Sequence, residues 1–346
     1  MKSVVAPLTQ LHHVLNEDML GLNNVLISRL ASDVPLVSVI AKHLLSAGGK
    51  RIRPLLTIAS QRLLGALKEE VLYLGAAVEL IHNATLLHDD VVDGSTLRRG
   101  QETANALWGN TSSVLVGDFL FSRAFQLMVM CKTDGVLNVL ANALANIAEG
   151  EVMQMTQSHS LDLDRETYLL IAQRKTAGLF EAACTIGSMV GSGASEQIQA
   201  LATYGRTLGL AFQITDDIFD YFPPDHYGKT PGDDFFEGKV TLPIMILADI
   251  INGRMASSGD AQSYQADAAW LNSLFTEQAT RTPDDYIRVC TLCVQHRVFD
   301  HCMHVATDFA QQAVDALSLF PETPIRLLLQ EIPPYMVDRC RDVCPS

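Results

Sequence analysis

The sequence has little positive charge for its length. Its 346 residues include 25 Lys and Arg against 39 Asp and Glu, which gives a formal net charge of −14. Non-specific nucleic-acid binding normally needs a basic surface, so we expect no nucleic-acid partner. An anionic small molecule stays open as a ligand, because it responds to the local charge rather than to the total.

Long hydrophobic runs are also absent from the sequence. No window reaches the roughly 18 uninterrupted apolar residues of a membrane-spanning helix. Residues 1–13 contain one Lys and no long apolar stretch, so we expect neither a secretory signal nor an anchor there. The cysteines number 7, which is odd, and this is typical of a reducing compartment rather than of a disulfide framework. These features predict a cytoplasmic protein.

One segment has cysteines and histidines at the spacing of a zinc site. The segment nevertheless reads as a continuous helix, without the glycines and turn residues of a zinc knuckle. We therefore interpret these side chains as ordinary helix packing. They are Cys290, Cys293, His296, His301, Cys302 and His304.

The alternation of apolar and polar residues that is typical of strands is scarce, whereas apolar residues recur at helical spacing nearly everywhere. Turn residues separate the helical runs, and Pro333-Pro334 is expected to separate the last two. Without a low-complexity linker or a short repeat, residues 1–346 are predicted to form one all-α domain, a large helical bundle. The expected helices span 11–31, 34–46, 54–65, 69–92, 103–110, 112–131, 135–157, 165–190, 195–222, 240–252, 284–318, 323–331 and 334–343.

Two aspartate clusters of the same form lie inside apolar helical runs. One extends from Asp89 to Asp93 and the other from Asp216 to Asp220, each with the pattern DDxxD. The first and fifth residues of such a motif share one face of a helix, so each cluster projects its carboxylates together. Acidic side chains are rarely buried unless they are paired or bound to a cation. The two clusters therefore predict a site for Mg²⁺, which usually shares its ligands with a phosphorylated substrate.

Basic residues gather beside glycine-containing turns and beside the aspartate clusters. The loop from Lys50 to Arg53 lies between two expected helix ends, where glycines can close one helix and Pro54 can open the next. Arg51 is expected to point away from its neighbours, toward solvent or an interface. Arginine is well suited to bidentate contact with phosphate. We predict two anionic groups, one bridged to the aspartates by metal and one held directly by cations.

Together these motifs resemble those of the trans-isoprenyl diphosphate synthases. The resemblance extends from about Gly48 to about Pro243. A single DDxxD motif would be weak evidence for it, because acidic helix faces are common. Two such motifs, with the basic loop and the Lys and Arg residues between them, form a specific combination. The stretch 108–125 is similar to the long-chain polyprenyl members that make quinone side chains. The other matching strings are Gly48 to Pro54, Leu86 to Asp93, Lys175-Thr176, Phe212 to Asp220 and Gly228 to Lys239.

The resemblance implies a role for individual residues. Three Mg²⁺ ions would bind with the allylic diphosphate, held by Asp89, Asp93 and Asp216 and supported, directly or through water, by Asp90, Asp217 and Asp220. The same diphosphate would contact Arg98, Lys175, Lys229 and Lys239. Isopentenyl diphosphate would contact Lys50, Arg53, His82 and Arg99. Oxygens near the allylic carbocation would come from Thr176 and Gln213, so the expected catalytic residues are Arg98, Lys175, Thr176 and Gln213.

The implied reaction is Mg²⁺-dependent prenyl transfer on an all-α isoprenoid synthase fold with a central active-site cavity. Metal ions and cations stabilise the leaving diphosphate as its negative charge develops. The allylic C–O bond ionises, the double bond of isopentenyl diphosphate attacks the cation, and a proton is lost to the departed pyrophosphate. The resemblance also implies a homodimer, with farnesyl diphosphate as the allylic substrate.

Small side chains precede the first aspartate cluster on its helix. Ala84 and Thr85 lie one turn before Asp89, and Ala76 and Ala77 lie about two turns deeper. Shorter-chain relatives generally carry a bulky aromatic side chain near the position of Ala84 or Thr85. The small side chains here leave the end of the cavity open to a longer chain. They therefore favour an octaprenyl to decaprenyl product, as in ubiquinone side chains. Release of so apolar a product is expected to need detergent or peripheral membrane contact.

Three other functions stay open from the sequence. A short-chain geranyl, farnesyl or geranylgeranyl diphosphate synthase shares the motifs but is disfavoured by Ala84. A regulatory subunit of a heteromeric synthase usually loses aspartates or basic residues that this chain keeps. A class I terpene cyclase shares the first aspartate motif but needs neither the basic loop nor the second motif. Arg339 and Arg341 receive no role.

Overall fold

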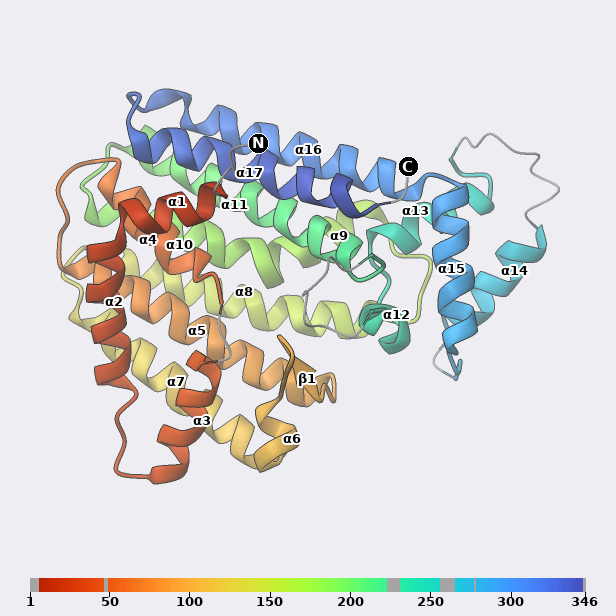
Figure 1. Ribbon diagram of the computed structural model, residues 1–346, viewed down its shortest axis with the longest axis horizontal. Helices are drawn as coiled ribbons and strands as arrows, with labels where there is room; N and C mark the ends of the chain where they lie inside the picture. The colour runs from red at the N-terminus through yellow and green to blue at the C-terminus, as the bar shows by residue number, and fades with distance from the viewer. Residues whose placement is uncertain (1–5, 47–48, 223–230, 256–264, 277, 345–346) are drawn as a thin grey trace.

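Helices form where apolar residues recur at helical spacing, and they account for nearly all of the regular structure (Figure 1). The computed structural model describes residues 6–46, 49–222, 231–255, 265–276 and 278–344. The prediction of an all-α fold is confirmed. The helices are α1 Pro7–Val14, α2 Asn16–Arg29, α3 Pro35–Ser46, α4 Ile52–Arg62, α5 Glu70–Val92, α6 Ala104–Trp108, α7 Asn110–Met130, α8 Val136–Gln157, α9 Arg165–Ala172, η1 Gln173–Ala177, α10 Gly178–Val190, α11 Ser195–Phe219, α12 Asp233–Glu237, α13 Leu242–Ile251, α14 Gln265–Leu274, α15 Pro283–Gln295, α16 Val298–Ala316, η3 Leu317–Leu319 and α17 Pro324–Val343.

The one sheet in the described residues is a short antiparallel hairpin that follows α5. Its strands are β1 (Leu97–Arg98) and β2 (Gln101–Glu102). Arg99 and Gly100 form the turn with positive φ values of 53° and 74°, as the favoured two-residue hairpin turns require. The hairpin thereby holds Arg98 and Arg99 beside the first aspartate cluster.

The apolar core consists of two clusters that share α11. The first contains side chains of α2, α4, α5, α7, α8 and α10 and reaches Leu208 on α11. The second contains Ile214 and Ile218 of α11 together with α13, α15 and α16. Figure 1 shows α5, α8, α10 and α11 running along the long axis in the middle of the molecule. Because α11 belongs to both clusters, the second aspartate motif is fixed near their junction.

The last helix continues through Pro333-Pro334, so the predicted break at this pair is wrong. Proline has no N–H, and at position 333 it leaves the carbonyl of Leu329 without its helical partner. The Tyr204 hydroxyl on α11 donates to that carbonyl at 2.9 Å. A tertiary hydrogen bond therefore replaces the helical one, and α17 stays packed on α11 and α16.

Two other predicted helices are each divided into two. The expected helix 284–318 breaks at Arg297, whose φ of 54° is left-handed and whose Nε lies 2.7 Å from Asp300 Oδ2. The expected helix 11–31 breaks at Leu15, which has φ −103° and ψ 21°. Apolar residues continue across both breaks, so the helical period gives no sign of them. The sequence also gave no prediction for α14.

Helix α7 has two apolar faces. One packs inside the molecule, and the other is exposed. It packs against α5, α6, α3 and α8. Among the described residues it is the one helix that is long and apolar enough to cross a membrane, and 39% of its apolar stretch is buried inside the protein. Large apolar side chains nevertheless remain exposed on it, including Leu115, Phe125 and Val129.

Candidate active site

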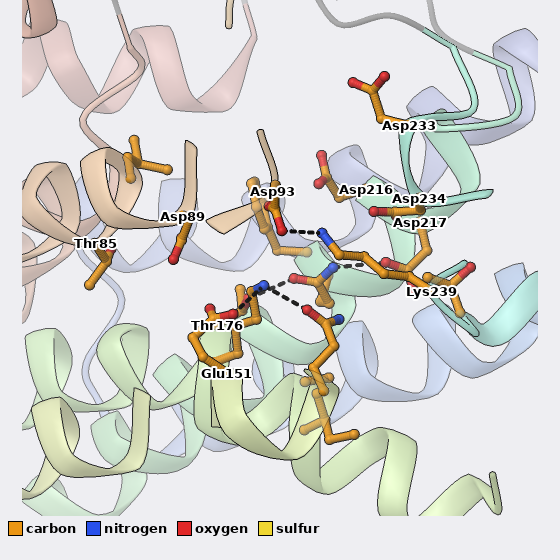
Figure 2. A pocket seen from close by; sticks show the side chains of 18 of the residues that line it. Thr85, Asp89, Asp93, Glu151, Thr176, Asp216, Asp217, Asp233, Asp234 and Lys239 are labelled. Carbon is orange, nitrogen blue, oxygen red and sulfur yellow. Dashed lines mark hydrogen bonds and ion pairs between the residues drawn. The ribbon is translucent and has the colours of Figure 1, made fainter. Parts of the chain in front are cut away.

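A cavity of about 680 Å³ lies between the two aspartate motifs. Asp89 and Asp93 line it from the end of α5, and Asp216 and Asp217 line it from the end of α11. Figure 2 shows these carboxylates on opposite sides of the cavity. The structure therefore brings four of the six predicted metal-binding aspartates to one place.

The other two aspartates of the motifs are buried and are not part of the cavity lining. Asp90 is 1% exposed and accepts a hydrogen bond from Arg98 Nε at 2.7 Å. Asp220 is also buried, at the end of α11. Since Arg98 itself lines the cavity, Asp90 acts on the site by holding that guanidinium against α5.

Burial raises the pKa of two of the cavity aspartates to about 7. At Asp89 burial has the largest effect, and the negative charges of Glu151 and Asp93 add to it. At Asp217 burial again has the largest effect, and Asp234 adds to it. Like charges in a poorly hydrated site disfavour one another, so the carboxylates on their own resist full ionisation.

The donor set fits Mg²⁺ that arrives together with a phosphorylated ligand. Within the described ranges, no three His, Cys, Asp or Glu side chains stand close enough together to hold a metal ion by themselves. Mg²⁺ commonly takes one or two carboxylates and completes its octahedron with water and phosphate oxygens. Carboxylates that could take this part are those of Asp89, Asp93, Asp216 and Asp217.

Lys239 connects the two sides of the cavity. Its Nζ lies 3.1 Å from Asp93 Oδ1 (Figure 2). The same Nζ lies 2.5 Å from Glu237 Oε2, and the Lys239 side chain is 14% exposed. Burial alone lowers the pKa of Lys239, but Asp234, Asp93 and Glu237 raise it above its usual value. Lys239 is therefore a charged group of the site rather than a surface lysine. Lys229, the other lysine predicted here, lies outside the described residues.

A second part of the cavity lining is basic. Arg53 Nη1 lies 3.2 Å from His82 Nε2, and the Arg53 guanidinium lies over the Phe180 ring at 4.4 Å. Burial, followed by the nearby arginines, lowers the pKa of His82 well below its usual value. The ring is therefore neutral, and its Nε2 accepts the hydrogen bond from Arg53. The basic residues of the lining are Lys50, Arg51, Arg53, Arg98, Arg99, Lys175, Lys239 and Arg339.

Arg51 lines the cavity, so the expectation that it faces solvent or an interface is wrong. Its φ of 43° is left-handed, which redirects its side chain at the start of α4, and its Nη1 donates to Asn23 Oδ1. In the same loop, a Cβ on Gly49 would lie 2.7 Å from Arg99 Nη1. The Arg99 guanidinium therefore packs against the backbone of Gly49, where the basic loop and the hairpin meet at the cavity.

One buried carboxylate lies among these basic side chains and was not predicted. Glu79 is 7% exposed and lines the cavity. Burial raises the pKa of Glu79, whereas Arg51, Arg53 and Arg99 lower it and stabilise the charged form. Glu79 precedes His82 by one helical turn, on the same face of α5, and this spacing is the sequence signal that could have identified it.

A π-helical turn, η1, interrupts the predicted helix at Lys175 and Thr176, which both line the cavity. Such turns are rare and are frequent at functional sites. Lys175 Nζ lies 2.8 Å from Glu151 Oε2 and 2.8 Å from Gln154 Oε1, both on α8. Figure 2 shows Glu151 and Thr176 close together below Asp89. The turn therefore presents two consecutive side chains to one cavity.

A chain of hydrogen bonds joins the two residues predicted to face the carbocation to a buried tyrosine. Thr176 Oγ1 donates to Gln213 Oε1 at 2.6 Å, and Gln213 Nε2 donates to Asp217 Oδ1 at 2.8 Å. The Tyr168 hydroxyl donates to Asp217 Oδ2 at 2.6 Å. Tyr168, on α9, is 5% exposed and was not predicted. Its position about two turns before Lys175 is the only signal for it in the sequence.

Of the two small residues expected beside the first aspartate, Thr85 lines the cavity. Ala84 is completely buried in the first core cluster and is not part of the lining. Apolar side chains complete this part of the wall, among them Leu86, Ile147 and Phe212. Thr85 is therefore the position at which a larger side chain would narrow the cavity.

None of the cysteines and histidines of the segment 290–304 lines this cavity. Cys293 on α15 and Cys302 on α16 are completely buried in the second core cluster. Burial raises the pKa of both thiols well above their usual value, which disfavours the thiolate that binds metals. The pair therefore behaves as small apolar side chains in the packing of the two helices.

Comparison with protein families and curated proteins gives matches over most of the chain. A family described as polyprenyl synthetase matches residues 34–258. Octaprenyl diphosphate synthase of Haemophilus influenzae is 37% identical over 339 residues, which cover 98% of this chain and 99% of that protein. The all-trans-nonaprenyl-diphosphate synthase (geranyl-diphosphate specific) of Rhodobacter capsulatus is 35% identical over 348 residues, which cover 98% of each.

Solved structures share the arrangement of the helices. A polyprenyl synthase from Caulobacter crescentus, complexed with calcium and isoprenyl diphosphate, has a TM-score of 0.89 and 42% identity, covering 96% of this chain and 98% of that one. A decaprenyl diphosphate synthase from Rhodobacter capsulatus has a TM-score of 0.88 and 39% identity, covering 98% and 100%.

Proposed function

The chain belongs to the polyprenyl synthetase family, and on this basis we propose that it is a long-chain trans-polyprenyl diphosphate synthase. It extends an allylic diphosphate with isopentenyl diphosphate units. The observation that carries this proposal is a single cavity lined by both aspartate motifs and by the basic loop. Such a lining suits two diphosphates, one at carboxylates that bind metal and one at cations alone. A terpene cyclase would need only the diphosphate site at the metal-binding carboxylates.

The allylic diphosphate binds between the two aspartate motifs. Asp89, Asp93 and Asp216 would hold Mg²⁺ there, and the metal would supply positive charge against the negative charge that develops on the leaving group. Lys175 donates to the same diphosphate from the π-helical turn. Lys239, which lines the cavity and pairs with Asp93 in this structure, contacts the same diphosphate.

Isopentenyl diphosphate binds at the basic part of the cavity. Lys50, Arg53 and Arg99 donate to its oxygens, and guanidinium groups do so in a bidentate manner. The neutral His82 accepts a hydrogen bond from Arg53 and so fixes the direction of that guanidinium. This diphosphate needs no metal, because the cations around it are numerous.

The allylic carbon ionises next to Thr176 and Gln213. Their oxygen atoms stabilise the positive charge that develops on the carbon, as prearranged dipoles do without reorganisation. The double bond of isopentenyl diphosphate attacks this carbon, and a proton passes to the departed pyrophosphate. No side-chain base is required, and the elongated product is again an allylic diphosphate.

The growing chain extends past Thr85 along apolar wall residues. The small side chain at this position leaves room for products longer than farnesyl, and the octaprenyl and nonaprenyl activities named for the relatives support an octaprenyl to decaprenyl product. We propose that the product becomes a quinone side chain. The enzyme acts in the cytoplasm, with peripheral membrane contact when it releases so apolar a molecule.

We propose a homodimer that forms through the exposed face of α7. Leu115 and Val129 on this helix are 62% and 71% exposed, and Phe125 is 44% exposed. Contiguous exposed apolar side chains mark interfaces, because their removal from water stabilises association. A second copy that covers this face would bury the apolar side chains of both subunits.

The proposal is tested by incorporation of labelled isopentenyl diphosphate into an allylic primer, with and without Mg²⁺. We expect elongation that requires Mg²⁺ and that falls at least about a hundredfold in Asp89→Asn and in Asp216→Asn. Asp249→Asn, whose carboxylate is 46% exposed on α13, is the matched control and keeps full activity. Elongation that persists in both site variants would overturn the assignment. Activity only after addition of a second protein would indicate a regulatory subunit.

A further inference from the structure

The hydrogen-bonded chain at the carbocation site ends on Tyr168, a side chain that the reaction above does not use. We propose that Tyr168 is a positioning residue: through Asp217 it sets which end of the Gln213 amide faces the allylic carbocation. The inference rests on the proposed function, because it assigns a role within that reaction.

The Gln213 amide has two ends of nearly equal shape and opposite polarity. Its oxygen carries negative partial charge and stabilises a cation, whereas its NH₂ group carries positive partial charge and opposes one. In the structure Oε1 accepts from Thr176 and Nε2 donates to Asp217. A half-turn of the amide would set its oxygen against the Asp217 carboxylate, so Asp217 determines the orientation.

Asp217 can do so only while its carboxylate is fixed as an acceptor. It is 1% exposed, and its two oxygens accept from Gln213 and from Tyr168. Without the tyrosine hydroxyl, one buried carboxylate oxygen loses its donor, which is strongly unfavourable for a charged group. The carboxylate is then free to rotate, and this rotation releases the Gln213 amide.

Tyr168 is itself held firmly enough for this role. Its ring is 5% exposed and belongs to the second core cluster. It lies on α9, which packs against α8 and α13 and leads directly into the π-helical turn with Thr176. Tyr168 and Thr176 therefore approach the Gln213–Asp217 pair from the same rigid segment, one at each end of the hydrogen-bonded chain.

The test compares Tyr168→Phe with Tyr204→Phe, which is a matched control. Both tyrosines are buried, and the hydroxyl of each donates one hydrogen bond across the core. That of Tyr204 goes to the Leu329 carbonyl, and neither of these two residues lines the cavity. We expect Tyr168→Phe to lower kcat about tenfold or more, with KM for each substrate changed less than about threefold. Tyr204→Phe should lower the Tm about as much as Tyr168→Phe does, but it should leave kcat at the wild-type value.

A double-mutant cycle tests whether Tyr168 acts through Gln213. In a Gln213→Leu background the amide is gone, so Tyr168→Phe should lower kcat less than about twofold further. Should Tyr168→Phe fail to fold, Tyr168→Gln and Tyr168→Met replace it. Only the glutamine side chain can donate a hydrogen bond to Asp217, so kcat should be higher in Tyr168→Gln than in Tyr168→Met.

Several results would overturn the proposal. These are an unchanged kcat in Tyr168→Phe, an equal loss in Tyr204→Phe, a fully additive loss in the Gln213→Leu background, or equal kcat in the glutamine and methionine variants. A wild-type protein that elongates no primer would overturn the proposed function and this inference together. An active wild type with any of the four results overturns the inference alone.

Discussion

Asp89 and Asp217 hold their protons to higher pH than exposed aspartates do, which makes ligand binding depend on pH. Burial raises the pKa of both carboxyls from the usual 3.8 to about 7. Between about pH 4 and pH 7 the folded protein therefore binds more protons than the unfolded chain. The contribution of these two groups to stability is therefore full below about pH 4 and is lost as the pH rises to about 7.

Metal and diphosphate need the charged carboxylates, so their stabilising effect should grow over the same interval. We predict that Mg²⁺ with pyrophosphate raises the Tm more at about pH 8 than at about pH 6. Differential scanning fluorimetry at both pH values measures this, and Asp89→Asn should reduce the difference. An equal rise in Tm at both pH values would contradict the assignment of these carboxylates as the metal site.

Glu79 is the counter-charge of the basic part of the cavity. Without it, Arg51, Arg53 and Arg99 would repel one another and lose the arrangement that a diphosphate needs. We predict that Glu79→Gln raises KM for isopentenyl diphosphate about tenfold and leaves KM for the allylic substrate nearly unchanged. Steady-state kinetics with each substrate varied in turn measures both constants.

The matched control for Glu79 is Glu149→Gln on α8, whose carboxylate is 59% exposed and pairs with Arg174. It should change neither KM. A lower KM for isopentenyl diphosphate in Glu79→Gln would mean that the carboxylate merely repels the ligand, and the positioning account would then be wrong.

The sequence predicted most of the charged side chains that line the cavity and missed Glu79 and Tyr168, which contact them. Aspartate pairs on apolar helices and arginines beside glycine turns are unusual enough to be recognised in one dimension. Tyr168 and Glu79 look like ordinary members of their helices, and only tertiary contacts give them partners. Arg51 was misplaced because its side-chain direction depends on a left-handed φ that no residue type at this position requires.

At the scale of elements, one face of α5 carries both the first aspartates and the position that limits the cavity. Thr85 lines the cavity one turn before Asp89. We predict that Thr85→Phe shortens the main product to one of geranylgeranyl or similar length, because the ring fills the path of the growing chain. Reversed-phase chromatography of the dephosphorylated products measures this.

Thr291→Phe is the control for this substitution, since Thr291 is exposed on α15, away from the cavity. Its products should keep the wild-type length. An unshortened product from an active Thr85→Phe enzyme would show that this face of α5 does not limit the chain.

Helix α17 depends on α11 at its two prolines. Tyr204 supplies the donor that Pro333 cannot, so its hydroxyl satisfies a buried carbonyl. We predict that Tyr204→Phe lowers the free energy of unfolding by about 1–3 kcal/mol, which is the usual cost of an unsatisfied buried acceptor. Urea unfolding followed by circular dichroism measures it, and a change below about 0.5 kcal/mol would indicate that water satisfies this carbonyl.

Most of the helices followed from the apolar period, and the exceptions have local causes that the period does not contain. The predicted break at Pro333-Pro334 failed because a side chain from another helix replaces the missing hydrogen bond. The predicted continuity of 284–318 failed at Arg297, where the chain turns so that α15 and α16 can pack at different angles (Figure 1). Both outcomes depend on partners that are far away in the sequence.

At the scale of the whole molecule, α7 carries large apolar side chains that one chain leaves exposed. We predict that Val129→Asp, which sets a charge in this face, shifts the protein from dimer to monomer in sedimentation equilibrium. Ile287→Asp on α15, at a site that is 61% exposed, is the matched control and should stay dimeric. A monomeric wild type would overturn the proposed homodimer, and a dimeric Val129→Asp protein would show that its interface lies elsewhere.

The length of the product tests the central claim most directly. The purified protein is incubated with farnesyl diphosphate, labelled isopentenyl diphosphate and Mg²⁺, and the extracted product is sized. The account predicts a ladder that ends between octaprenyl and decaprenyl diphosphate. A ladder that stops at geranylgeranyl diphosphate would contradict the open floor at Thr85 and make the chain a short-chain member of its family.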